Sequence, residues 1–116
     1  MPAAVANPLI EQGAAFALGI ETDLDYTGLL GRAWLRHCLQ GNVVATPTVT
    51  IPPAMGKRID VTMTPAQTLA IPAYGKAFSE LESFDFLVEL YDPADATRVY
   101  RMVQGVARVS PRGRIP

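Results

Sequence analysis

The stretch that most constrains the fold is residues 83–109, which reads as two long strands joined by a tight turn. Successive side chains of a strand point to opposite faces, so an apolar residue at every second position indicates one buried face. The first strand shows this alternation at Phe84, Phe86, Val88 and Leu90. Pro93 presets φ for the turn, and the carboxylate of Asp92 can accept a hydrogen bond from the backbone ahead of it. The apolar face of such a hairpin must be covered by a second layer.

The return strand, residues 98–109, breaks its own alternation. Tyr100 and Met102 share one face, but on strict alternation Val106 falls on the same side as Arg108. A β-bulge inserts one extra residue and shifts the faces, and glycine in a strand often marks one. We therefore predict a bulge at Gly105.

The rest of the chain predicts further short strands and one helical turn. Thr64, Pro65 and Gln67 form a helix start with an N-cap, a proline at the first position and a capping box. Pro72 ends that helix near residue 70, and Leu69 is expected to plug one end of the fold. Tyr74 and Phe78 are expected to pin the following loop to the core. Alternating or β-branched stretches predict strands at 13–20, 31–39, 43–51 and 58–63.

These elements together predict an all-β protein: an antiparallel β-sandwich of six to eight strands with one short helical turn near 64–70. The ten prolines, spread along the chain, fit short strands and turns better than a helical bundle. The expected core consists of Phe16, Leu18, Leu35, Ile59, Val61, Phe84, Phe86, Val88 and Leu90.

A chain of 116 residues predicts one domain, which we place at 13–110. Residues 1–12 are rich in Ala and Pro and show no sustained period, so we expect an extended N-terminal arm. This arm is either a frayed end or a segment that orders against a neighbour, which can be another copy or a different protein. The same holds for the C-terminal tail at 111–116.

Composition excludes several classes of function. The net charge of −1 gives no global attraction to nucleic acid, and the single cysteine excludes an intramolecular disulfide. The longest apolar run, 14–20, is far shorter than a membrane span, and the N-terminus lacks the pattern of a secretory signal. We expect a soluble protein without a membrane partner.

Catalytic and metal-binding patterns are not found in the sequence. His37 and Cys38 are adjacent, so in a strand they point to opposite faces and cannot form a thiolate–imidazole pair. No Gly-x-Ser-x-Gly elbow and no phosphate-binding glycine loop is present. We expect no catalytic residue, no cofactor, no metal and no small-molecule substrate.

The candidate interface residues fall into three groups. Trp34 lies between Arg32 and Arg36 on an expected outer strand face, where its ring either stacks on a partner or is covered by the second sheet or a loop of its own chain. The other two groups have opposite charge: the tail residues Arg112 and Arg114, and the acidic loop residues Glu21, Asp23 and Asp25. This polarity favours contact between copies or with another protein.

The segments together resemble small structural proteins of tailed bacteriophages, and are similar to the N-terminal domain of upper-baseplate, receptor-binding-protein adaptors. The motifs that carry the resemblance are IEQGAAF (10–16), DYTG (25–28), RAWLR (32–36), IDVTMTPAQT (59–68), FDF (84–86), YD (91–92), VYRMVQGV (99–106) and VSP (109–111). The chain departs from that family in lacking a long C-terminal extension and in its loops at 51–57 and 73–83.

The resemblance implies a non-enzymatic building block of the virion. Its partners would be other copies of itself and other virion proteins, as a tail, baseplate or fibre-attachment adaptor assembled in the host bacterial cytoplasm. A capsid decoration (cement) or head–tail joining protein is an alternative. A stand-alone carbohydrate- or nucleic-acid-binding module that uses Trp34 and the arginines is an alternative of another class.

Overall fold

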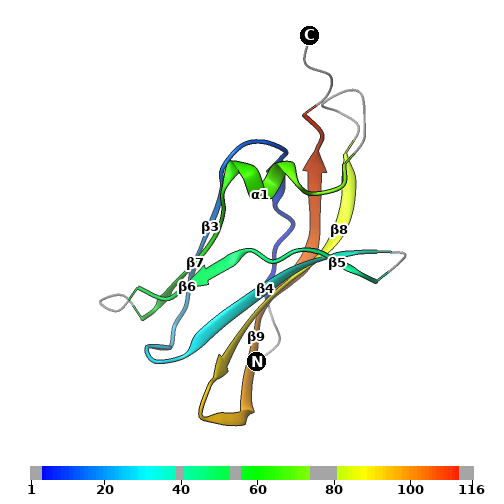
Figure 1. Cartoon of the computed structure of the whole chain (residues 1–116). Helices are drawn as coiled ribbons and strands as arrows, with labels where there is room; N and C mark the ends of the chain where they lie inside the picture. The colour runs from blue at the N-terminus through cyan, green and yellow to red at the C-terminus, as the bar shows by residue number, and fades with distance from the viewer. Residues whose placement is uncertain (1–3, 39–40, 53–55, 74–80, 113–116) are drawn as a thin grey trace.

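The computed structural model describes residues 4–38, 41–52, 56–73 and 81–112 (Figure 1). Its elements in chain order are β1 Ala4–Val5, β2 Leu9–Glu11, β3 Phe16–Glu21, β4 Leu30–His37, β5 Val43–Ala45, β6 Thr48–Thr50, β7 Arg58–Met63, α1 Pro65–Leu69, β8 Glu82–Asp92 and β9 Asp95–Ser110. Within these ranges no helix is long and apolar enough to cross a membrane.

The strands form two sheets. The larger has the order β1-β9-β8-β4-β5, with β2 also paired to β9, and the smaller has the order β3-β7-β6. The predicted all-β, sandwich-like fold is confirmed. It is not purely antiparallel, because β1 and β2 run parallel to β9. In Figure 1, α1 and the β8–β9 turn lie at opposite ends of the molecule.

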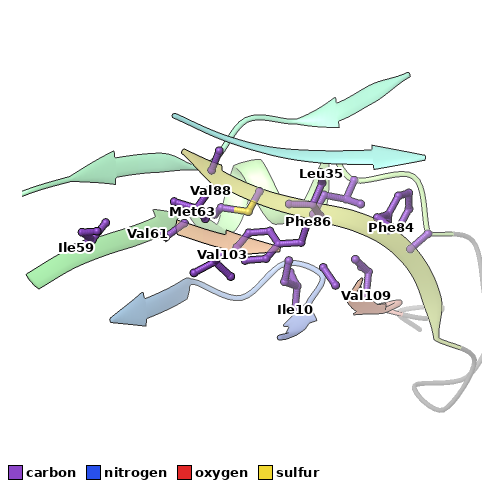
Figure 2. Close-up of a cluster of buried hydrophobic side chains, with 14 of the residues drawn as sticks. Ile10, Leu35, Ile59, Val61, Met63, Phe84, Phe86, Val88, Val103 and Val109 are labelled. Atoms are coloured by element: carbon purple, nitrogen blue, oxygen red, sulfur yellow. The ribbon is translucent and has the colours of Figure 1, made fainter. Parts of the chain in front are cut away.

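The core fills the space between the two sheets (Figure 2). Its large, almost fully buried side chains are Ile10, Leu35, Ile59, Val61, Met63, Ile71, Phe84, Phe86, Val88, Leu90, Val103 and Val109. The buried positions of β7 and β8 are the ones that alternation predicted. Phe16 and Leu18 pack against this core but are only half-buried, because β3 is an edge strand.

The expectation that residues 1–12 form an arm outside the sandwich is wrong for the part that the structure describes. β1 and β2 add to the edge of β9, and Ile10 is fully buried in the core. The Asn7 side-chain oxygen accepts a hydrogen bond from the Val106 N–H at 3.0 Å. The Gln12 side-chain amide donates to the Ile71 carbonyl at 2.8 Å, and its oxygen accepts from the Arg112 N–H at 2.9 Å. Removal of this segment would therefore cost part of the core.

The bulge in β9 is not at Gly105. Gly105 is in register with Phe86, whereas the register shifts between Val88 and Glu89, which leaves Met102 as the extra residue. Gly105 is needed for another reason: a Cβ there would overlap the carbonyl oxygen of Ala6. The missing side chain makes room for the N-terminal segment, which a sequence pattern within β9 cannot reveal.

The stretch 43–51 was expected to be one strand, but it forms two in different sheets. β5 pairs with β4 in the larger sheet, and β6 pairs with β7 in the smaller. Thr46 and the buried Pro47 separate them. Proline lacks a backbone donor, so the ladder is interrupted where the chain crosses between the sheets.

The predicted capping box of α1 is confirmed. The Thr64 hydroxyl accepts from the Gln67 N–H at 3.2 Å, and the Gln67 side chain accepts from the Thr64 N–H at 2.8 Å. Leu69 does not plug the sandwich, since it is exposed; Thr68 and Ile71 are buried instead. The turn at Asp92 also forms as expected, with its carboxylate accepting from the Ala94 N–H. Tyr74 and Phe78 lie outside the described residues.

Candidate interaction surface

The outer face of the larger sheet carries the predicted group around Trp34. β4 alternates, so that Ala33 and Leu35 are buried in the core while Arg32, Trp34 and Arg36 face outward. Trp34 is in register with Leu87 of β8 and is half-buried by its neighbours on the same sheet. The second sheet lies on the opposite side and does not cover the Trp34 ring.

Arg32 is held in place on this face. Its guanidinium carbon lies 5.4 Å from the centroid of the Trp34 ring and 4.7 Å from that of Tyr91. Its Nε lies 3.2 Å from Oε1 of Glu89, the residue in register with it on β8. Cation–π contact and an ion pair together fix the guanidinium, which leaves it less available to a partner than an unpaired cation.

His37 and Cys38 point in different directions and contact different residues. The His37 ring is 6.0 Å from that of Phe84, edge-on, on the core side. The Cys38 sulfur is 3.6 Å from Oδ1 of Asp85. Burial and the nearby Asp85 carboxylate raise the pKa of Cys38 above its ordinary value, so the thiolate is disfavoured.

The acidic loop follows β3 and is exposed at all three predicted residues. Asp25 is committed to local structure: its Oδ1 accepts from the Thr27 hydroxyl at 2.6 Å and from the Thr27 N–H at 2.9 Å. These hydrogen bonds lower the pKa of Asp25 below its ordinary value. Glu21 is in register with Arg58 and lines a shallow depression with it. Asp23, exposed like the other two, lies at the tip of the loop.

The basic tail and the acidic loop do not meet within one chain. Arg112 lies beside Gly13, before β3 begins, whereas the acidic loop starts where β3 ends. Six residues of strand separate them by roughly 20 Å. Arg114 lies outside the described residues. A contact between these two groups would require two copies, as the sequence suggested.

A second set of outward residues was missed by the sequence reading. Val5, Leu9 and Val106 are exposed on the outer face of the larger sheet. Val5 and Leu9 belong to the segment that was expected to be an arm. Val106 was missed because a bulge at Gly105 would have placed it on the other face of β9. The sequence carries little signal for this strand, because Leu9 and Ile10 are both apolar and show no alternation.

Among the described residues, no group of three or more His, Cys, Asp or Glu side chains could hold a metal ion. No protein-family model matches the sequence, and no curated protein matches it either. One similar solved structure is that of the NK cell receptor Nkp44, described as a triggering partner in natural cytotoxicity. It aligns with 95% of this chain and 100% of the receptor chain at 17% identity and a TM-score of 0.47. A likeness this weak assigns neither a family nor a function.

Proposed function

We propose that the chain is a non-enzymatic structural subunit of a tailed bacteriophage virion, present in several copies as a tail, baseplate or fibre-attachment adaptor. Its partners are other copies of itself and other virion proteins, and it is assembled into particles in the bacterial cytoplasm. The proposal rests on the sequence resemblance and on one structural observation.

That observation is the outer face of the larger sheet. The face has no second layer over it in the described chain, yet apolar and aromatic side chains project from five of its strands. These are Val5, Leu9, Leu30, Trp34, Leu87, Tyr91, Val99 and Val106. Charged residues, such as Arg32, Glu89 and Arg101, cross the sheet between these apolar residues. Exposed apolar surface of this kind, set among charged groups, is typical of a protein-binding face. It supports a role in assembly.

The same face supports a capsid decoration or head–tail joining role equally well, and location in the particle separates these from a tail role. A stand-alone carbohydrate or nucleic-acid module is less well supported. The Trp34 ring has the Arg32 guanidinium against it and is half-buried, so it does not offer a free stacking platform.

The test is mass spectrometry of purified heads and tails from the phage or prophage that encodes the chain. Stoichiometric presence in tails supports the adaptor role, and presence in heads moves the protein to the decoration role. Absence from both fractions would refute a virion function.

A further inference from the structure

The outer apolar patch, defined as Val5, Leu9 and Val106, is a compact feature of the larger sheet. Val5 is in register with Gln104 and Leu9 with Arg108, so Val106 lies between them on β9. Their exposed fractions are 72%, 54% and 37%. Diagonal neighbours on a sheet face lie roughly 7–8 Å apart, so the three side chains form one continuous surface. Removal of apolar surface from water is favourable, so a second apolar group that covers this surface would stabilise the resulting complex.

Cations surround this patch. Arg101 and Arg108 project from the same face of β9, and Arg36 projects from β4. In the part of the chain that the structure describes, none of the three takes part in an ion pair. The neighbouring carboxylate of Glu89 is paired with Arg32. Asp85, in register with Val106, and Glu11, on the same face of β2 as Leu9, also lie here, so three arginines stand against two carboxylates and the patch keeps a net positive charge. The chemistry of this face therefore favours an occupant that combines an apolar side chain with a carboxylate.

The chain itself carries such an occupant at the tip of the acidic loop. Leu24 is 61% exposed and stands next to the exposed Asp23. The bend is held by hydrogen bonds on both sides of the tip: the Thr22 hydroxyl donates to the Leu24 carbonyl at 2.7 Å, and the Thr22 N–H donates to the Lys57 carbonyl at 2.8 Å. The Tyr26 N–H donates to the Gly56 carbonyl at 2.8 Å. A preorganised tip loses little conformational entropy on binding.

The tip cannot reach the patch of its own chain. Tyr26 follows the tip and its ring lies 5.9 Å from that of Tyr100. Tyr100 is in register with the buried Leu90, so it is on the core side of the sheet. The loop and the patch thus lie on opposite sides of the larger sheet. The loop of one copy can therefore reach only the patch of another copy.

We propose that the outer apolar patch binds the Asp23–Leu24 loop tip of a second copy, with Leu24 on the patch and Asp23 among its arginines. The donor and acceptor surfaces differ, so the contact is heterologous and each copy offers one of each. Repetition of such a contact gives either a closed ring or an open filament of subunits. This inference rests on the proposed function and names the partner and the surfaces of that assembly.

The test uses sedimentation velocity of the purified chain over a concentration series. One small contact predicts weak self-association, with a Kd of roughly 1 mM or tighter, that weakens as salt is added. Leu24→Ser and Val106→Ser should each weaken it at least about tenfold. Leu69→Ser is the matched control, since Leu69 is another exposed leucine, 46% exposed, on α1; it should leave association unchanged. Circular dichroism checks that each variant is folded.

Disulfide trapping tests whether residue 24 of one copy lies next to residue 106 of another. In a Cys38→Ser background, a Leu24→Cys chain is mixed with a Val106→Cys chain and oxidised. Preferential formation of the mixed dimer over either homodimer supports the proposal. A chain that stays monomeric at the highest concentration, or association insensitive to Leu24→Ser, would overturn it. Neither of these results would remove the protein from purified particles, so failure here is distinct from failure of the proposed function.

Discussion

Replacement of Ile10 by alanine tests whether the N-terminal segment packs on β9, which could not be predicted from the sequence. Ile10 has no exposed surface and lies in the core cluster (Figure 2). The substitution removes three buried carbons, each worth about 0.8 kcal/mol, or roughly 2.5 kcal/mol in total. The cavity left behind raises the expected loss to about 3–4 kcal/mol, which is a large fraction of the stability of an ordinary domain.

The assay is urea unfolding followed by circular dichroism. Ile10→Ala should lower the midpoint with little change in slope, because the slope follows the surface exposed on unfolding. Leu9→Ala is the matched control on the same strand: Leu9 points outward, so its loss should stay within about 0.5 kcal/mol. A loss below about 1 kcal/mol for Ile10→Ala, or equal losses for both variants, would mean that the segment does not occupy the β9 edge in solution.

Three further outcomes are expected. Gly105→Ala should displace the N-terminal segment and destabilise the fold by roughly 1–3 kcal/mol, with faster amide exchange along the β9 edge; unchanged exchange would contradict the close approach at this glycine. Thr64→Ala should cost about 0.5–2 kcal/mol in thermal unfolding, and no change would exclude a role for the cap. Asp25 should titrate below its ordinary pKa by NMR, and Thr27→Val should raise that pKa. Because the folded pKa is depressed, the loop's stabilisation is complete above about pH 4 and is lost as the pH falls through the folded pKa; an unshifted Asp25 would refute the hydrogen bonds.

Elements governed by local pattern could be predicted from the sequence. The alternation of β8 and β7 sets which residues are buried, and the capping box of α1 depends on residues three apart. The outward direction of Trp34 follows from the same alternation. In each case the information lies within a few neighbouring residues, where strand or helix geometry alone decides the outcome.

Features that depend on distant pairing could not be predicted. Whether residues 4–11 form strands depends on a free edge of β9 and on the space left at Gly105, and neither is written in the N-terminal sequence. Likewise, the stretch around Pro47 has β propensity throughout, and the two sheets decide that it divides. The outer apolar patch depends on the first of these pairings, that of β1 and β2 with β9, so it emerged only from the folded chain.

The pairing of the N-terminal segment with β9 has a consequence for the order in which the protein forms. The hydrogen bond between Asn7 and Val106 joins residues 99 apart in the chain. On the ribosome, residues 4–11 are synthesised well before β9, so they have no edge to join until β9 has emerged. Ordering such a long loop is entropically costly, and folds rich in contacts of this kind fold slowly. We therefore expect pairing of β1 and β2 to be the last step of folding, with the edge of β9 briefly open to a segment from a neighbouring nascent chain.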